Sequence, residues 1–517
     1  MTSELVEFVL EETTRPIDRW AVAATLESGG IRDLDARERF GKRDVFDLAD
    51  EVYAQCLDRD PAGVRPAPDE IEPHRALATA RRYLRGGFFF LQLALQLGSL
   101  AVLGYSQWAS LEFSSRQASV VGIALLASFL LTGPAVQATG YLGPSFTESG
   151  KHLLAARVVA AMVGIGLATL LVGAVAWWAI NLVADSYDNR SLGVALVYYV
   201  LAGCIVLTGA ALYVLKQFTA MFVATVAGIA VVGLVLHRTS LGIYGAHWIG
   251  LSVSIVIEAT WAAVVLARRA ARTSPDLRTA VRPPLPLLVS LAAPHGLYGI
   301  GYFALLFADR LAAWSTDPHG LPFTFRAPYE VGLDWALISV VPGLALLEVT
   351  IYEFSRLLGS AGDRFHAVDT RAYRRVLLRF YRRQLALVGI LLAVGTAVAF
   401  GGLKLAAHLH ATKISDLFSD PTTGHVYVLG LAGYALLVLG LFNGLFLFSL
   451  NRPWLVLQAL APAVVVAVVV AFVLSRTIVY WAAAGGLVAG AFVYAILSGR
   501  NALRLLAAVD YHYFAAY

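Results

Sequence analysis

From Gly86 onward, apolar runs of about 18–28 residues alternate with short polar segments. A helix needs about 20 predominantly apolar residues to cross the hydrocarbon core of a bilayer. None of these runs alternates with a period of two residues, so each is expected to be a helix and not a membrane strand. The pattern predicts twelve membrane-spanning helices, at 86–106, 118–138, 156–183, 192–214, 217–237, 241–267, 284–308, 331–354, 385–407, 425–449, 454–475 and 478–499.

The stretch before these runs is polar, and its few apolar residues recur at helical intervals. Examples are Phe40, Val45, Phe46, Leu48 and Val52. Proline and glycine from Asp60 onward then indicate a linker. The expected organisation is an acidic cytosolic helical region and linker at 1–75, a six-helix lobe at 76–270, a cytosolic linker at 271–283, a second six-helix lobe at 284–503 and a cytosolic tail at 504–517.

The long polar segment after the sixth run divides the chain into two sets of six spans. Both sets begin on the same side, so the lobes are expected to be parallel repeats. The second span contains Gly133 and Pro134, and its counterpart, the eighth span, contains Pro342 and Gly343. Proline is tolerated within membrane helices when neighbouring helices compensate for the lost hydrogen bond, and the match favours the repeat.

Arginine and lysine between the spans predict the orientation, because cytoplasmic loops are enriched in them. With the N-terminus inside, the cytoplasmic segments from Arg81 onward hold about 22 basic residues, and the outer side holds about eight. Those eight are Arg116, Arg190, Arg238, Arg310, Arg326, Lys404, Lys413 and Arg476. Both termini are therefore expected to be cytosolic. The chain as a whole is expected to be a multi-pass protein of the bacterial inner membrane.

Composition supports the same class of protein. Hydrophobic residues make up 58% of the chain and charged residues 15%, with a mean hydropathy of +0.68, whereas soluble domains average about 25% charged residues. The net charge of +5 conceals an asymmetry, since residues up to Arg85 include 18 acidic and 13 basic side chains. The cysteines, Cys56 and Cys204, are too few for a disulfide framework or a cysteine-based zinc site.

Ionisable residues within membrane spans are expensive to bury and are candidates for function. Glu258, in the sixth span, can bind a proton or cation, hydrogen-bond a sugar hydroxyl, or pair structurally with a neighbouring helix. His247 and His295 are weaker candidates, because a lone histidine in a helix bundle is more often a satisfied packing residue.

The end of the seventh span and the start of the eighth carry opposite charges. They predict a charged ring at the outer mouth of the second lobe, formed by Asp309, Arg310, Tyr329, Glu330, Asp334 and Lys404. Such a ring can gate a cavity by forming and breaking ion pairs, or it can simply fix the helix ends. Pro294 is expected to break the seventh span, and discontinuous helices often line the path of a transported substrate.

Catalytic signatures are absent from the sequence. It contains no P-loop, no HExxH and no GxSxG pattern. We therefore expect no catalytic residues, no cofactor, no metal site and no enzyme activity. The arginine-rich loop 356–383 adjoins a span, where basic residues contact anionic lipid headgroups, and nucleic-acid binding is not expected.

Several residues resemble a known family. The run from Phe307 to Arg310, then Trp314, then Ala327 to Glu330, and then Pro342 to Ala345 are similar to the PelG family of Pel exopolysaccharide transporters. That family belongs to the multidrug/oligosaccharidyl-lipid/polysaccharide (MOP) flippase superfamily. Phe380, Tyr381 and the C-terminal stretch from Leu505 to His512 fit as well, whereas the first lobe matches only in hydropathy.

The resemblance implies two six-helix lobes around a cavity that moves a polysaccharide or its precursor. It also implies a cytosolic glycosyltransferase or synthase as partner. The acidic region 1–75, which departs from the family pattern, and the basic loop 356–383 are expected to be the docking surfaces for this partner. The leading expectation is therefore a flippase-like exopolysaccharide transporter. An ion-coupled small-molecule exporter of the same superfamily, with Glu258 carrying the ion, is the first alternative, and a membrane-embedded glycosyltransferase or polymerase is the second.

Overall fold

The computed structural model of this chain describes residues 2–13, 16, 18–59, 83, 92, 94–148, 151–271, 284–316, 321–359, 370–408 and 420–507. Helices account for almost all of this part of the chain, and it contains no strand. The helices are α1 (Thr2–Thr13), α2 (Arg19–Ser28), α3 (Asp33–Phe40), α4 (Val45–Arg59), α6 (Ser115–Glu148), α7 (His152–Ala184), α8 (Asn189–Val214), α9 (Phe218–Arg238), α10 (Gly242–Ala271), α12 (Leu285–Trp314), α13 (Ala327–Gly359), α15 (Thr370–His408), α17 (Pro421–Ser449), α18 (Pro453–Thr477), the 3₁₀ turn η1 (Tyr480–Ala483) and α19 (Ala484–Ala507).

Eleven of these helices, from α6 to α19, are long and apolar enough to cross a membrane. They confirm the second to the twelfth predicted spans and an all-α polytopic fold. Of the first predicted span, 86–106, the described part contains an apolar helix at Ala94–Leu103. The linker part of 1–75, from residue 60 onward, lies outside the described residues. Of the predicted linker 271–283 only Ala271, the last residue of α10, is described, and of the predicted tail 504–517 only 504–507, the end of α19. The cytosolic placement of the termini stays a prediction.

The chain divides into two compact units. The smaller unit comprises Met1–Ala80, Val349–Gln384 and Leu503–Tyr517, and the larger comprises Arg81–Glu348 and Leu385–Ala502. Helices α13, α15 and α19 contribute to both units.

In the smaller unit, α1 to α4 have a core of their own. Its fully buried apolar members include Val6, Val9, Val22, Leu26, Ala36, Leu48 and Val52. Local polar contacts fix the helix starts: Asp18 accepts a hydrogen bond of 2.8 Å from the N–H of Ala21 at the start of α2. Asp33 accepts one of 3.0 Å from the N–H of Val45 at the start of α4. The apolar spacing seen in the sequence thus forms a small helical cluster.

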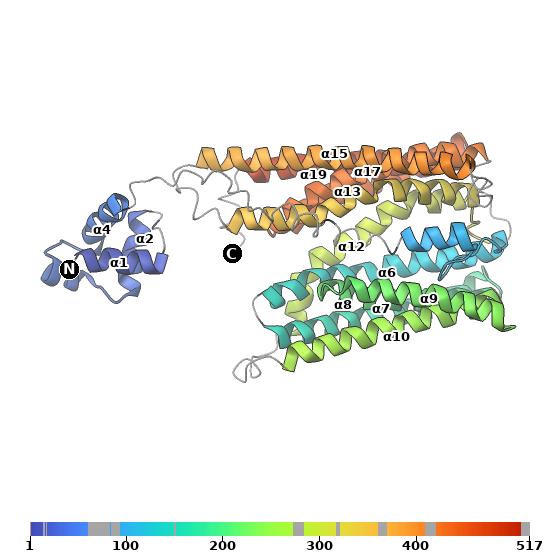
Figure 1. The fold of residues 1–517 in the computed structure, drawn as a ribbon, viewed down its shortest axis with the longest axis horizontal. Helices are drawn as coiled ribbons and strands as arrows, with labels where there is room; N and C mark the ends of the chain where they lie inside the picture. Colours follow the sequence, from blue (N-terminus) through green and yellow to red (C-terminus); the bar gives the residue numbers. More distant parts are fainter. Residues whose placement is uncertain are drawn as a thin grey trace. The chain divides into compact units, whose positions relative to one another are not determined.

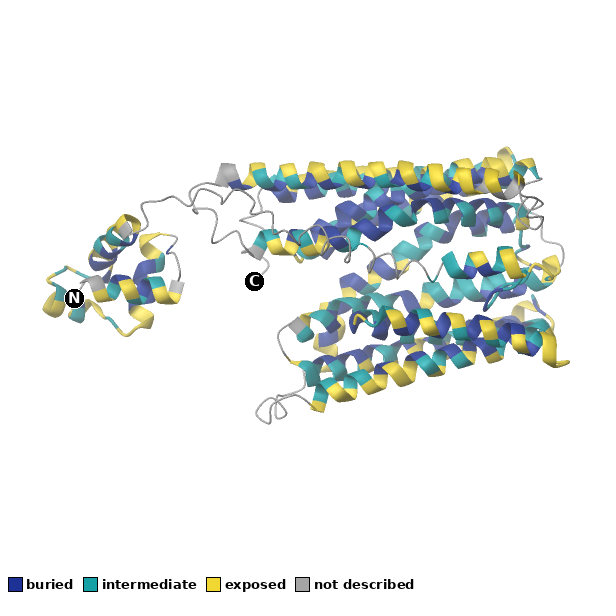
Figure 2. Cartoon of the chain, in the orientation of Figure 1, coloured by how far each residue is buried: buried dark blue, intermediate teal, exposed yellow. Residues whose placement is uncertain are grey.

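In the larger unit, α6 to α10 pack on one another, and α12 packs against both α6 and α18 (Figure 1). Figure 2 shows exposed residues along α10 and α15. Many of the large exposed side chains on the long helices are apolar. Val172, Val183, Val398 and Val465 are each more than 60% exposed. Apolar surface on this scale is what a bilayer covers.

Close helix contact between α6 and α12 depends on two glycines. A Cβ atom on Gly299 would lie 2.4 Å from the carbonyl oxygen of Gly133, so the two backbones touch at this crossing. Small residues permit such approach between membrane helices.

The predicted break at Pro294 is wrong, because α12 continues from Leu285 to Trp314 with this proline inside it. Neighbouring helices pack around Pro294, which is buried, and stabilise the helix there.

A polar contact between the first turn of α6 and the start of α8 lies outside the membrane spans. Asp188 caps α8 by accepting from the N–H of Ser191 at 3.2 Å, and Arg116 lies 2.5 Å from its carboxylate. The hydrogen bonds from Ser191, followed by the charge of Arg116, lower the pKa of Asp188 to about 2. The cap therefore stays ionised throughout the physiological pH range.

Candidate functional site

A buried cluster of charged and aromatic side chains joins the end of α12 to the start of α13. Asp309 and Arg310 are 0% and 6% exposed, and Glu330 is 9% exposed. The connection folds back so that Tyr329 and Glu330 face α12, with the N–H of Thr324 bonded to the carbonyl of Trp314 at 2.9 Å. Four of the six residues predicted to form a charged ring therefore meet, but they are buried against one another.

Each of the three guanidinium nitrogens of Arg310 donates a hydrogen bond. Its Nε donates to Glu330 Oε2 at 2.9 Å, and Nη2 donates to the hydroxyl of Tyr434 on α17 at 3.1 Å. Nη1 donates to the carbonyl of Leu306 at 3.1 Å. A charged pair removed from water is tolerated only when its remaining hydrogen-bonding atoms are also paired, and Arg310 meets this condition.

The two carboxylates of the cluster have further donors. Glu330 Oε1 accepts from Trp314 Nε1 at 3.0 Å, and Asp309 Oδ2 accepts from the hydroxyl of Tyr329 at 2.7 Å. Asp309 Oδ1 is buried without a hydrogen-bond partner. Asp334 lies one turn after Glu330 on α13 and is half-buried. The site thus contains three carboxyl groups and one guanidinium group.

Lys404 is not part of this cluster. It is exposed on α15, with its ammonium nitrogen 5.6 Å from the ring centroid of Phe400 on the same helix. The predicted ring of six is therefore a compact group of four, with Asp334 beside it and Lys404 elsewhere.

The first lobe contains a second polar site around Glu258 on α10. Glu258 is 2% exposed, and Thr208 Oγ1 on α8 donates to its Oε2 at 2.6 Å. One turn earlier, Ser254 accepts from Gln107 Nε2 at 2.6 Å and donates to the carbonyl of Ala224 at 2.7 Å. Gln96 in turn hydrogen-bonds the side chain of Gln107. Glu258 therefore lies at the end of a buried row of hydrogen-bonding groups.

His247 lies on the same face of α10, about three turns before Glu258. Its Nδ1 is 2.7 Å from the hydroxyl of Tyr198, and its buried Nε2 has no hydrogen-bond partner. Phe113 packs edge-on against the imidazole at 5.6 Å. These contacts resemble those of a packing histidine, and they do not connect His247 to Glu258 directly.

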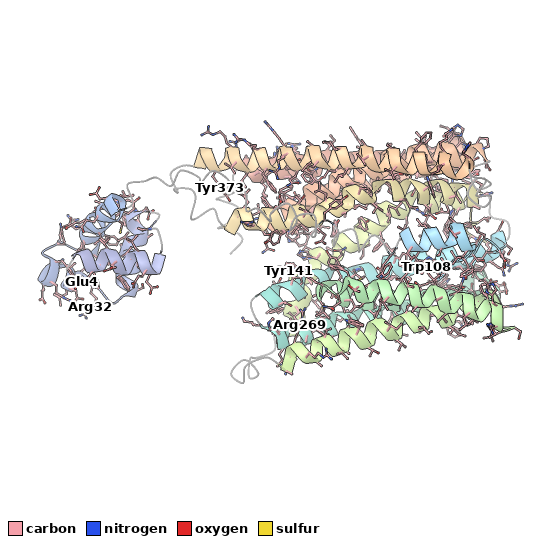
Figure 3. All side chains as sticks on the ribbon, viewed as in Figure 1. Glu4, Arg32, Trp108, Tyr141, Arg269 and Tyr373 are labelled. Atoms are coloured by element: carbon pink, nitrogen blue, oxygen red, sulfur yellow. The ribbon has the colours of Figure 1, made fainter. Side chains whose placement is uncertain are left out.

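His295 lies where α6, α12 and α17 meet. Its ring stacks on Tyr141 of α6, with centroids 3.8 Å apart and planes at 12°, and on Phe448 of α17 at 5.3 Å and 29°. Tyr141 also donates a hydrogen bond of 3.3 Å to Asn451, which follows α17. In Figure 3, Tyr141 lies toward the same end of the larger unit as Arg269, away from Trp108. His295 thus connects the two lobes through a sandwich of rings.

Sequence reasoning missed several partners of these sites, among them Thr208, Tyr434, Gln107 and Gln96. Tyr434 stands more than 100 residues from Arg310, and nothing in its local sequence marks it. The two glutamines have a weak signal, because an amide within or next to an apolar run must find a hydrogen-bond partner.

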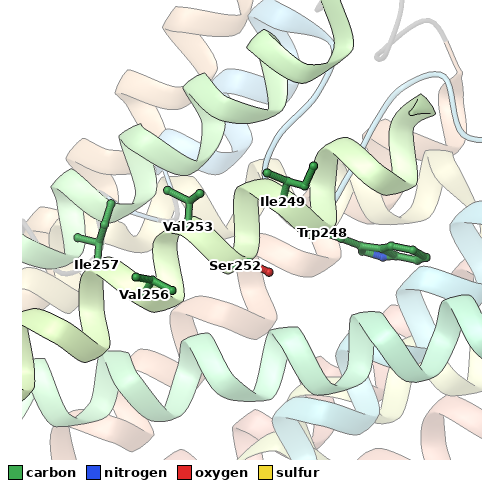
Figure 4. Close-up of a pocket in the computed structure, with 6 residues that line it drawn as sticks. All are labelled: Trp248, Ile249, Ser252, Val253, Val256 and Ile257. Atoms are coloured by element: carbon green, nitrogen blue, oxygen red, sulfur yellow. The ribbon is translucent and has the colours of Figure 1, made fainter. Parts of the chain in front are cut away.

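A groove of about 400 Å³ is lined by α10 alone, through Trp248, Ile249, Ser252, Val253, Val256 and Ile257 (Figure 4). These side chains lie on the face of α10 away from His247 and Glu258, and Val256 is 63% exposed. The groove is apolar and adjoins neither polar site.

In the described part of the chain, no three His, Cys, Asp or Glu side chains are grouped closely enough to hold a metal ion.

No protein-family model and no curated protein matches the sequence, but solved structures share the fold. A MOP superfamily transporter from Pyrococcus furiosus, described as having a binding pocket of reverse polarity, has a TM-score of 0.57 and 16% identity, covering 83% of this chain and 96% of its own. A MATE transporter from Vibrio cholerae has a TM-score of 0.58 and 16% identity, covering 84% and 98%. An inward-facing multidrug resistance MATE transporter has a TM-score of 0.51 and 15% identity, covering 83% and 95%. This chain therefore has the fold of MOP superfamily transporters.

Proposed function

We propose that this chain is a transporter of the bacterial inner membrane that moves an exopolysaccharide, or its lipid-linked precursor, by alternating access of its two lobes. The observation that carries the transport step is the contact between the lobes. It consists of a close crossing at Gly133 and Gly299 and of separable side-chain contacts, such as the hydrogen bond from Tyr213 to Glu348. The shared fold supports this, since a similar structure is described as inward-facing.

The polysaccharide cargo is supported by the resemblance to the PelG family. The residues that carry it at the seventh and eighth spans form two adjacent hydrogen-bonded groups: Glu330 with Arg310 and Trp314, and Asp309 with Tyr329. A shared motif whose members bond to one another is more informative than scattered matches, because the members depend on each other for burial.

The test uses a polymer-producing host that lacks its own copy of this chain. Restoring the chain is expected to restore surface polysaccharide, measured by lectin binding. With Cys56 and Cys204 first replaced by serine, Tyr213→Cys and Glu348→Cys are then linked by a bis-methanethiosulfonate cross-linker, whose disulfides are cleaved by reduction. The linked protein should stop exporting polymer and resume after reduction. Full export by the linked protein would contradict alternating access.

Docking of a cytosolic glycosyltransferase is the second part of the proposal. On the α1–α4 cluster, Trp20 and Phe46 are 56% and 46% exposed with ring centroids 5.2 Å apart. Arg19 lies over the Trp20 ring at 5.1 Å and pairs with Asp50 at 3.5 Å. Exposed aromatic pairs are frequent anchors of protein interfaces. On the described part of loop 356–383, exposed arginines lie along α15, at Arg374, Arg375, Arg379, Arg382 and Arg383.

Deleting residues 1–75 is therefore expected to lower synthase co-purification and surface polymer several-fold while membrane insertion is unchanged. Replacing Trp20 and Phe46 together with alanine should reproduce most of this loss without removing the helices. A matched control is Leu34→Ala, which changes an exposed leucine of the same cluster. Normal co-purification in both the deletion and the Trp20/Phe46 double variant would exclude docking through this region.

A second candidate function is favoured by the site around Glu258. A carboxyl group 2% exposed, with Thr208 as its one hydrogen-bond donor on the described residues, is suited to bind and release a proton or cation. If the chain is an ion-coupled small-molecule exporter, Glu258→Gln should abolish transport of a fluorescent lipophilic cation driven by a proton or sodium gradient. Thr208→Val, which removes only the donor, should weaken it. Gradient-independent export that survives Glu258→Gln would exclude this coupling role.

A further inference from the structure

Aromatic side chains recur along α12. His295, Tyr298, Tyr302, Phe303 and Phe307 span about 18 Å of helix at 1.5 Å per residue. Tyr298 and Tyr302 stack with centroids 6.1 Å apart, Tyr302 contacts Phe303 at 5.3 Å, and Phe303 stacks on Phe307 at 5.5 Å. We call these five residues the aromatic track.

Both lobes cover this track. Phe129 of α6 packs on Phe303 and Phe307 at 6.1 Å and 6.4 Å. Phe448 of α17 packs edge-on against Tyr298 at 4.9 Å and stacks on His295. If the lobes part during transport, the ring faces that now contact the opposite lobe become free, and the track runs between them.

The chemistry of the track differs from an ordinary helix interface. Leucine and valine would bury as much apolar surface, but three of the five rings carry a polar atom at the edge, and the Nδ1 of His295 is buried without a partner. Tyrosine and histidine combine an apolar face with a polar edge, so they tolerate both a packed and a wetted state. The track ends one turn before Arg310, where the charged cluster begins.

We propose that the aromatic track is a saccharide-binding path, on which pyranose rings of the cargo stack when the lobes separate. A pyranose presents a flat face of C–H groups that fits an aromatic ring face, and hydroxyls at its rim that need hydrogen-bonding partners. The Tyr141–His295–Phe448 sandwich, with ring planes within 30° of parallel, closes the path in the present state. A sugar ring entering this sandwich replaces one of its stacked rings. The inference rests on the proposed function and assigns its cargo to a site.

The test compares variants in the full-length chain in the polymer-producing host. Phe448→Leu and Tyr141→Leu keep apolar bulk but remove a ring face, and each should lower surface polymer about tenfold. Saccharide that co-purifies with the detergent-extracted protein, measured as monosaccharides after acid hydrolysis, should fall in parallel.

Phe442→Leu is the matched control, because it removes a fully buried ring of the same helix α17 that packs on Phe446 and not on the track. Equal losses in Phe442→Leu and Phe448→Leu would mean that the rings serve packing, and would overturn the track. If deletion of the chain abolishes export but Phe448→Leu and Tyr141→Leu export normally, the aromatic track is not a binding path, while the proposed function stands. Unchanged polymer after deletion of the chain would overturn the proposed function itself.

Discussion

Arg310→Ala is expected to leave little folded protein in the membrane. The variant removes the one guanidinium of the buried cluster and leaves Glu330 and Asp309 with no positive partner, while Tyr434 loses its donor. Breaking a buried ion pair by deleting one member costs roughly 3 to 5 kcal/mol, because the remaining charge stays buried. This is a large fraction of the stability of a typical domain, about 5 to 15 kcal/mol. Size-exclusion profiles of a fluorescent fusion and the thermal midpoint in detergent measure the loss.

The matched control is Arg238→Ala, which removes an exposed arginine at the end of α9 and should change neither measurement. A second variant distinguishes the effect of the unpaired charge from the effect of the lost side-chain volume. Arg310→Met combined with Glu330→Gln removes one charge of each sign, and should recover part of the lost stability, because only Asp309 is then left without its positive neighbour. If Arg310→Ala melts like the wild type, the cluster is hydrated and the buried ion pair described here does not govern stability.

Gly299→Ala is expected to have the next largest effect. The new methyl group would lie 2.4 Å and 2.6 Å from the carbonyl oxygen and carbon of Gly133, and backbone atoms cannot rotate away as a side chain can. The helices α6 and α12 must separate, at a cost of about 1 to 3 kcal/mol or more for overpacking. We expect a lower thermal midpoint and, because this crossing joins the lobes, slower polymer export per folded molecule.

Gly296→Ala provides the control on the same helix. Its Cβ would lie 3.6 Å from the nearest atom, Cβ of Pro134, which is an ordinary contact. Alanine favours a helix over glycine by about 1 kcal/mol, so this variant should be as stable as the wild type or more so. Equal destabilisation of both variants would show that the effect is general to α12 and not specific to the crossing.

The fold was accessible from the sequence because the bilayer simplifies the problem. Each span must satisfy its backbone hydrogen bonds within itself, so an apolar run of about 20 residues already implies a helix. The predicted spans at 217–237 and 454–475 agree closely with α9 and α18. Pro294 was misinterpreted because local sequence reports only the lost hydrogen bond, whereas the packing that stabilises the helix around it comes from distant residues.

Only some members of the candidate sites could be predicted from the sequence, for a related reason. Asp309 and Glu330 lie at facing ends of consecutive helices, so their proximity follows from chain connectivity. Tyr434 and Phe448 reach the same regions from α17, and only the three-dimensional packing brings them there. Lys404 shows the opposite error, since a matching predicted depth in the membrane does not place a side chain on the matching face.

The charged cluster also constrains the order in which the chain can enter the membrane. Helix α12 is the least apolar of the eleven described spans. Asp309 and Arg310 would each cost a few kcal/mol within the bilayer if α12 were released alone. Glu330, which offsets Arg310, arrives only with α13. We therefore expect α12 to remain beside the insertion machinery until α13 has been synthesised, so that the two helices leave together as a hairpin.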